Sequence, residues 1–172
     1  MEVNIEKSKT LEKEIAFLNG SLKTLEILNN GLYTGNTFYF CSINNYSNNI
    51  EKSIIEHLKL ANWSVELKEN DSFFSDLDLT LKEYCTSFLH SIYEEFDRII
   101  LNKENTVPKL IDKINYEDIR NMLYNSIEKI ISQSFTVYTV RLSGKGWYEA
   151  TYKDFLFECD NKYYYLHFGT SD

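Results

Sequence analysis

The sequence predicts one α+β domain, in which several amphipathic helices pack on an antiparallel sheet that ends in a C-terminal three-stranded meander. Three observations support this prediction. The chain has 172 residues, a length that suits one domain with a proper core. Most of the chain before residue 132 carries apolar residues at helical spacing. Residues 135–168 are rich in aromatic and β-branched residues, lack proline, and contain Gly-Lys-Gly and Asp-Asn turns, as a meander does.

The first helix is expected over residues 9–29, where apolar residues recur at spacings of three and four. The stripe consists of Leu11, Ile15, Leu18, Leu22 and Leu25. Gly20 interrupts it, so either one helix passes through Gly20 at a cost of about 1 kcal/mol, or Ser21 caps a second helix. We interpret the stripe as core, with a dimer seam as the alternative, because a coiled coil needs a longer repeat.

A strand and a helix are expected next. Residues 37–43 are largely apolar and predict a strand, and an Asn-rich loop follows it. A helix is predicted over residues 50–61. Asn48 and Glu51, three residues apart, resemble the capping pair that would begin it.

The middle of the chain predicts a hairpin and then a long helix. Trp63, Val65 and Leu67 alternate with polar residues, which indicates a half-buried strand. Residues 73–79 are interpreted as its hairpin partner. A helix over residues 81–101 is expected to begin with a capping box and to form the central core element; the box consists of Thr80 and Glu83.

Two more helices are expected before the meander. Pro108, the only proline, suits the first turn of a short helix that ends near residue 114. A longer helix is predicted over residues 116–132, with Asn115 as its cap and acidic residues in its first turn, where they complement the helix dipole.

Charge and cysteine content narrow the class of protein. The chain holds 18 basic and 26 acidic residues, a net charge of −8, which disfavours binding to nucleic acid and favours a basic protein partner. The same charge also serves solubility. The three cysteines (Cys41, Cys85 and Cys159) are odd in number and far apart, which argues against a disulfide framework and fits a reducing compartment. With no apolar N-terminal segment and no apolar run of membrane-spanning length, a cytoplasmic protein without membrane contact is expected.

Motifs of enzymes and metal sites are missing from the sequence. It contains no His-Glu-x-x-His, Cys-x-x-Cys or Gly-x-Ser-x-Gly pattern, and residues 143–146 (Ser-Gly-Lys-Gly) lack the spacing of a phosphate-binding loop. We therefore expect no metal and no cofactor. A Cys–His pair that the fold assembles from distant residues stays open.

The final hairpin predicts two distinct sheet faces. If Asp160 and Asn161 form a two-residue turn, Cys159 lies opposite Lys162, and the alternation of side chains then follows. One face is apolar and is expected to form core; it holds Phe155, Phe157, Tyr164, Leu166 and Phe168. The other face is mixed, with Asp154 directly opposite His167; it holds Tyr152, Asp154, Leu156, Glu158, Tyr163, Tyr165 and His167. Cys159 and His167 fall on opposite faces. The register of the preceding strand, 135–142, stays open because residues 147–159 are long enough to contain a bulge.

The mixed face has two interpretations. Either another layer of the protein covers it, or it is a partner-binding surface, since exposed tyrosines beside charged residues are typical of interface hot spots. On the second interpretation the site residues are Tyr152, Asp154, Glu158, Tyr163, Tyr165 and His167. No catalytic nucleophile is identifiable beside them.

An acidic chain rich in Asn and Tyr that ends in YKDFLFECDNKYYYLHFGTSD resembles the immunity proteins of bacterial polymorphic and contact-dependent growth-inhibition toxin systems. The resemblance covers these last residues and the general character of the chain, and such proteins do not share one fold. It implies a non-enzymatic protein that binds and neutralises a cognate toxin domain, often a nuclease. No residue role carries over. Two alternatives are a small hydrolase that uses His167 with Asp154 or a cysteine, and a structural or regulatory subunit that dimerises through the Leu11–Leu25 stripe.

Overall fold

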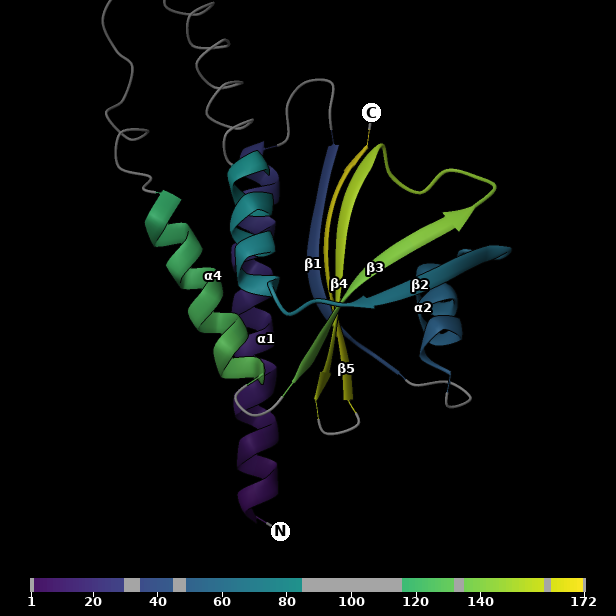
Figure 1. Ribbon diagram of the computed structural model, residues 1–172. Helices are drawn as coiled ribbons and strands as arrows, with labels where there is room; N and C mark the ends of the chain where they lie inside the picture. Colours follow the sequence, from purple (N-terminus) through teal and green to yellow (C-terminus); the bar gives the residue numbers. More distant parts are fainter. Residues whose placement is uncertain are drawn as a thin grey trace, which may run out of the picture.

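The structure, a computed structural model, describes residues 2–29, 35–44, 49–84, 116–131, 135–159 and 162–171 (Figure 1). These residues form a five-stranded antiparallel sheet in the order β1-β5-β4-β3-β2, with helices on both faces. The strands are β1 (Gly35–Ile43), β2 (Trp63–Glu69), β3 (Thr136–Gly144), β4 (Thr151–Cys159) and β5 (Lys162–Ser171). The predicted α+β class and the C-terminal meander, β3-β4-β5, are confirmed.

Helices cover the two faces of the sheet unequally. On one side, the first face, lie α1 (Glu2–Asn29), the helical segment 73–84 and α4 (Tyr116–Ile131). On the other side, the second face, lies the short helix α2 (Ile50–Leu58), as Figure 1 shows. Each face has its own apolar core. The second face therefore receives far less cover than the first.

Helix α1 is continuous through Gly20, so the first of the two alternatives for this region is confirmed. Leu18, Leu22 and Leu25 are buried in the first-face core, and Leu11 and Ile15 pack against that core. The interpretation of this stripe as core is confirmed. A dimer seam on the same stripe is wrong, because Leu18 and Leu22 have no exposed surface left for a second chain.

The interpretation of residues 73–79 as a strand is wrong. Residues 73–84 are helical, and the helix begins where the amide N–H of Asp76 donates to the carbonyl oxygen of Ser72 at 3.0 Å. Thr80, expected as a cap, lies inside this helix, where its hydroxyl donates to the carbonyl of Asp76 at 2.7 Å. The remainder of the predicted 81–101 helix, and the helix expected at 108–114, lie outside the described residues.

Helix α2 begins at Ile50, as predicted, but its N-cap is one residue later than the predicted cap, Asn48. Asn49 is the N-cap, and its side-chain oxygen accepts from the backbone N–H of Lys52 at 2.6 Å. Asn48 lies outside the described residues. The helix ends at Leu58 rather than near residue 61, because Lys59 adopts the left-handed conformation with φ of 56°.

The final hairpin has the predicted register. Cys159 pairs with Lys162 and Asp154 pairs with His167, although the turn at residues 160–161 is outside the described residues. The apolar face of this hairpin is in the first-face core, as expected for Phe155, Phe157, Tyr164, Leu166 and Phe168. The long stretch before residue 159 holds no bulge in its ladder with β3: residues 145–150 form a connection, and β4 starts at Thr151.

Candidate functional site

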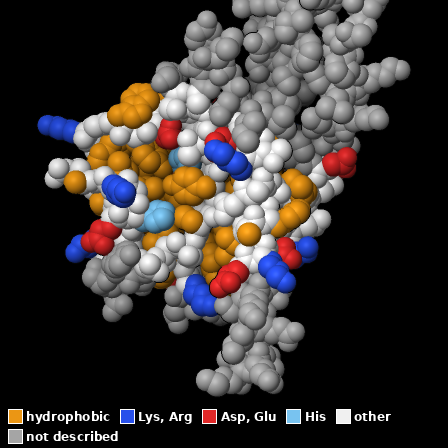
Figure 2. Space-filling view, turned by 180° about the vertical axis from the view of Figure 1, so that it is seen from behind, with side chains coloured by type: hydrophobic (Ala, Val, Ile, Leu, Met, Phe, Trp, Pro, Cys, Tyr) orange, Lys and Arg blue, Asp and Glu red, His pale blue; other side chains and the backbone are white. Residues whose placement is uncertain are grey.

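The second face is the surface that the sequence marks as mixed, and the structure shows that α2 covers only part of it. Figure 2 looks at this region from behind: hydrophobic and histidine side chains lie side by side there, with charged side chains around them. Ile54 of α2 is buried in the second-face core together with Val140, Leu156 and Tyr165 of the sheet. Several tyrosines around this core are half-buried: Tyr39, Tyr138, Tyr148, Tyr152 and Tyr163.

Asp154 and His167 form a buried pair at the centre of this face. They lie opposite each other on β4 and β5, as predicted, and their exposed fractions are 1% and 2%. His167 Nδ1 lies 2.6 Å from Asp154 Oδ1. Because a carboxylate has no proton to donate, this short contact assigns the Nδ1 proton to the imidazole. The arrangement fixes the ring so that Nε2 points away from Asp154.

Two phenols complete the shell of Asp154. Tyr165 donates to Oδ2 at 2.6 Å and Tyr148 donates to the same oxygen at 3.1 Å. Burial raises the pKa of both phenols, and the negative charge of Asp154 raises them further, so both keep the protons they donate. With His167, Asp154 therefore accepts three hydrogen bonds, which is the condition under which a buried carboxylate is tolerated.

The remaining side of the His167 ring is also enclosed. Tyr39 stacks on it with ring centroids 4.8 Å apart. Gly169, two residues along β5, leaves the space in which Nε2 lies: a Cβ at that position would be 2.5 Å from Nε2. Beyond Nε2 is Glu149, whose Oε1 is 3.8 Å away, too far for a hydrogen bond. Nε2 thus faces a carboxylate across a small gap.

Glu149 is the member of this cluster whose carboxylate lies in an unfavourable environment. Its Oε2 is buried and has no hydrogen-bond partner among the described residues. Burial raises its pKa above the ordinary value, His167 opposes this rise, and Asp154 adds to it. A raised carboxyl pKa means that the folded protein holds the proton more tightly than the unfolded chain, so this group lowers stability as pH rises through the folded pKa.

Replacing Glu149 by Gln should therefore stabilise the protein at pH 7, by about 1 kcal/mol, because a neutral amide replaces a buried, unpartnered carboxylate oxygen. The gain should shrink as pH falls toward the ordinary carboxyl pKa, where wild-type Glu149 is itself neutral. Urea unfolding at several pH values measures this. A variant that is less stable at pH 7 would show instead that Glu149 pairs with protonated His167.

The structure separates the six predicted site residues into two groups. Asp154, Tyr165 and His167 are buried, so for them the alternative of a covered face is confirmed and the interpretation as exposed contact residues is wrong. The other three, Tyr152, Glu158 and Tyr163, are half-buried. The Tyr152 hydroxyl is engaged with β3, since it donates to the carbonyl of Leu142 and accepts from its N–H, both at 3.1 Å.

Glu158 lies between two phenols at the end of the second face that is remote from Tyr152. Tyr138 donates to one carboxylate oxygen at 3.2 Å, and Tyr163 donates to the other at 3.1 Å. Burial raises the pKa of both phenols and Glu158 raises it further; the nearby carboxylates of Glu69 and Glu51 add to the rise at Tyr138 and Tyr163 respectively. These five residues, Glu51, Glu69, Tyr138, Glu158 and Tyr163, are called the acidic tyrosine patch below.

Sequence reasoning did not find three members of this patch. Glu69 and Tyr138 pair across β2 and β3, and Glu51 belongs to the first turn of α2. The only local signal was the alternation along β2, which puts Glu69 on the same side as Leu67. Which strand lies beside β2 depends on contacts between residues far apart in the chain, so the sequence offers no signal for the neighbour.

A Cys–His pair assembled from distant residues is also present. Cys41 of β1 and His57 of α2 are in contact, with Sγ 3.3 Å from Nε2. Burial raises the pKa of the Cys41 thiol to about 11 and lowers the pKa of His57. Both shifts favour the neutral forms, whereas a nucleophilic cysteine needs a lowered thiol pKa. The pair therefore has the geometry of a dyad without its activation.

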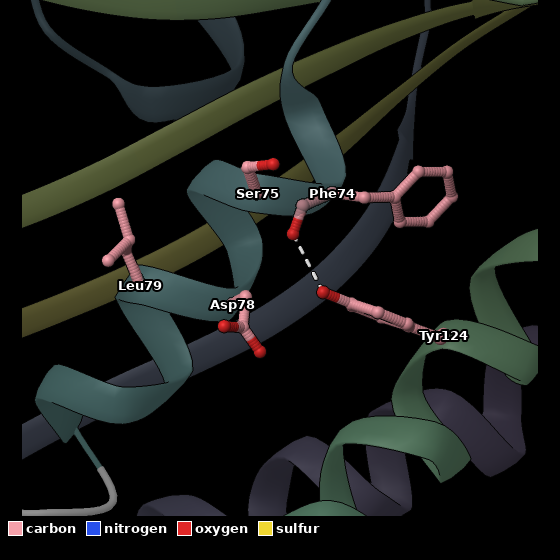
Figure 3. Close-up of a pocket in the computed structure, with 5 residues that line it drawn as sticks. All are labelled: Phe74, Ser75, Asp78, Leu79 and Tyr124. Carbon is pink, nitrogen blue, oxygen red and sulfur yellow. Dashed lines mark hydrogen bonds between the residues drawn. The ribbon is translucent and has the colours of Figure 1, made fainter.

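A shallow pocket opens on the other side of the molecule, between the segment 73–84 and α4 (Figure 3). Its lining is Phe74, Ser75, Asp78, Leu79 and Tyr124. Tyr124 donates a hydrogen bond to the carbonyl of Phe74 at 2.7 Å, as the dashed line in Figure 3 marks. The single carboxylate in the lining, Asp78, is ion-paired with Lys82 at 2.8 Å. The lining offers no cluster of groups for chemistry.

No cluster of three or more metal-ligating side chains occurs within the described residues. Over the same part of the chain, no helix combines the length with the apolar character that crossing a membrane requires. Comparisons with protein-family models, with curated proteins and with solved structures found no match.

Proposed function

We propose that this protein is a non-enzymatic immunity-type protein, which binds a basic toxin domain through the acidic tyrosine patch and thereby neutralises it. The observation that carries the proposal is Glu158, held between Tyr138 and Tyr163 with the carboxylates of Glu51 and Glu69 close by. The net charge of −8 and the resemblance of the C-terminal residues to immunity proteins of growth-inhibition systems support it.

The chemistry of the patch suits Lys and Arg side chains. None of its three carboxylates is ion-paired with another residue in the described ranges. Both phenols are held in place by Glu158, so little side-chain entropy is lost when a partner binds. Tyrosine supplies apolar contact area together with a polar tip, a combination that is frequent in binding hot spots. Acidic rim charges also raise the rate of association with a basic partner.

On this proposal, the buried cluster around Asp154 stabilises the arrangement of the patch. Asp154 joins β4 to β5 through His167 and Tyr165, and Tyr148 connects the 145–150 segment to the same carboxylate. Glu158 and Tyr163 belong to the same two strands. The hydrogen bonds that Asp154 accepts from His167, Tyr165 and Tyr148 restrict the relative movement of these strands. It keeps the patch in one arrangement before the partner arrives.

The hydrolase alternative has one observation in its favour, the predicted Asp154–His167 pair. Against it stand the burial of His167 and the position of Glu149 beside Nε2. In the part of the chain that the structure describes, no serine, threonine or cysteine is hydrogen-bonded to His167. Cys41, the cysteine on this face with a histidine partner, contacts His57 instead. The binding function is therefore the better supported of the two.

A double variant tests the patch. Glu69→Gln with Glu158→Gln removes two charges while keeping side-chain size, and it should weaken binding to the toxin domain encoded next to this gene by roughly ten- to a thousandfold. The affinity should fall because Lys and Arg side chains of the partner lose the carboxylates that pair with them. Isothermal titration calorimetry measures the affinity, and survival of cells that express the toxin domain measures neutralisation.

The matched control is Glu12→Gln with Glu128→Gln, which makes the same change in net charge at exposed positions of α1 and α4. This control should bind like the wild type. Equal weakening by the two double variants would mean that net charge alone matters and that the patch is not the contact. Absence of any complex between the wild-type protein and the toxin domain, together with no protection, would refute the function itself.

A further inference from the structure

The two edges of the sheet differ in how their backbone is protected. Strand order places β1 at one edge and β2 at the other, so each presents a row of backbone N–H and C=O groups that no strand of the described sheet satisfies. Such rows bind other strands unless the protein blocks them. Within the described part of the chain, one edge is blocked and the other is open.

Helix α1 closes the β1 edge with side chains. The side-chain amide of Asn19 donates to the carbonyl of Phe40 at 2.6 Å, and its oxygen accepts from the N–H of the same residue at 2.8 Å. Glu26 accepts from the N–H of Phe38 at 3.2 Å. Asn19 thus imitates the backbone of a neighbouring strand. No further strand joins this edge without displacing these bonds.

Among the residues that the structure describes, none protects the β2 edge in this way. The backbone N–H of Asn70 donates to the carbonyl of Val137 at 2.8 Å, so Asn70 directs its backbone groups toward β3. In antiparallel pairs, alternate residues direct their backbone groups toward the neighbour and away from it. Val65, Leu67 and Glu69 therefore direct theirs away from β3. No side chain within the described ranges is hydrogen-bonded to the outer backbone groups of Val65 or Leu67.

The side chains of β2 alternate in the way that a paired strand requires. Trp63, Val65 and Leu67 are half-buried in the second-face core. Glu66 and Lys68 project on the opposite side, where both are exposed. Neither is ion-paired with another residue of the described chain. The strand thus presents two opposite charges, two residues apart, beside an open backbone edge.

We propose that this edge is a self-association surface, where the β2 strands of two copies pair antiparallel about a two-fold axis at Leu67. Leu67 of one copy then lies opposite Leu67 of the other. Glu66 of each copy faces Lys68 of the other, so two complementary charge pairs form on one side of the joined sheet. The two Leu67 side chains continue the apolar row of the second face across the interface, and Val65 of each copy lies opposite Glu69 of the other.

Charge selects this register from the alternatives. A two-fold axis at Glu66 would place Glu opposite Glu, and an axis at Lys68 would place Lys opposite Lys; like charges directly across strands are unfavourable. An axis at Val65 would set Ser64 against Glu66 and leave Lys68 without an anion. Only the axis at Leu67 pairs both charges. Because the two-fold contact uses the same edge of both copies, the assembly is complete after two copies and is a dimer.

The dimer should be weak and dependent on concentration. A seven-residue strand gives a contact smaller than the standard interface of about 1,600 Å². Wild-type protein should therefore change from monomer to dimer over a concentration series in sedimentation velocity, and hydrogen exchange at Val65 and Leu67 should slow as the dimer forms.

Charge reversal tests the register. Glu66→Lys gives a strand with two lysines, and Lys68→Glu gives one with two glutamates, so each variant alone should raise the dissociation constant roughly tenfold or more. An equimolar mixture of the two variants restores both Glu–Lys pairs and should dimerise as tightly as the wild type. The control Glu12→Lys makes the same charge change as Glu66→Lys, at an exposed position of α1, and should leave the dimer intact.

Each outcome decides the proposal. Glu66→Lys also faces Arg141 within the sheet, so thermal unfolding of each variant checks that any loss of dimer is not a loss of fold. A wild type that stays monomeric at its highest soluble concentration overturns the proposal and leaves the edge to a strand of another protein. A dimer that both variants keep, or that the mixture fails to restore, overturns the register.

Discussion

Replacing Asp154 by Ala is expected to lower the free energy of unfolding by about 3–5 kcal/mol, because each of three hydrogen-bond donors loses its buried acceptor at a cost of about 1–3 kcal/mol. The side chain accepts hydrogen bonds from His167 and Tyr165, which are buried, and from Tyr148, which is half-buried. Without the carboxylate, the three donors are left in a site that water reaches poorly. Urea denaturation followed by circular dichroism measures the loss.

Single-donor variants calibrate this result. Tyr165→Phe and Tyr148→Phe each remove one hydrogen bond and keep the ring, so each should cost about 1 kcal/mol. Asp154→Asn keeps the shape but loses the charge, and its cost should lie between those of the phenylalanine variants and Asp154→Ala. If Asp154→Ala proves no more harmful than Tyr165→Phe, the carboxylate is not the centre of the network and the proposed support for β4 and β5 fails.

Local pattern was sufficient to predict this pair. A two-residue turn and strict alternation determine which residues face each other in a hairpin. The prediction that Asp154 lies opposite His167, and that Phe155 and Phe157 face the other way, needed nothing beyond the residues 152–168. Both statements hold in the structure.

What covers the mixed face could not be predicted in the same way. Cover comes from α2, from Tyr39 on β1 and from Tyr148 in the connection before β4, which are distant from β5 in the chain. Apolar stripes tell which side of a helix is buried, but not which face of which sheet receives it. The sequence therefore did not determine whether Asp154, Tyr165 and His167 are exposed; the structure shows that they are buried.

The error at residues 73–79 has a local cause. Leu77, Leu79 and Leu81 alternate like a strand, yet Phe73, Leu77 and Leu81 also recur every four residues like a helix. The two patterns differ at Leu79, which would be buried in a strand and lies outside the stripe in a helix. In the structure its exposed fraction is 63%, whereas Phe73, Leu77 and Leu81 are buried. Short apolar runs carry this ambiguity between the two periods.

The second large effect is expected at Gly169, a glycine that lies inside β5, neither in a turn nor at a positive φ. A Cβ there would lie 2.5 Å from His167 Nε2, 2.8 Å from Cε1 and 3.0 Å from the carboxyl carbon of Glu149. His167 is fixed by Asp154 and stacked on Tyr39, so it has little room to yield. Gly169→Ala should therefore lower the free energy of unfolding by about 1–3 kcal/mol, the usual cost of overpacking.

A double-mutant cycle identifies the cause. In a His167→Ala background the ring that the new methyl group meets is absent, so adding Gly169→Ala should cost much less than it does alone. Gly20→Ala is the matched control: no heavy atom lies within 4 Å of its added Cβ, and in a helix interior Ala should stabilise by about 1 kcal/mol. Equal costs of Gly169→Ala in both backgrounds would assign the clash to Glu149 or the backbone. A strong coupling would establish that Gly169 is required because His167 occupies the space where a side chain would be.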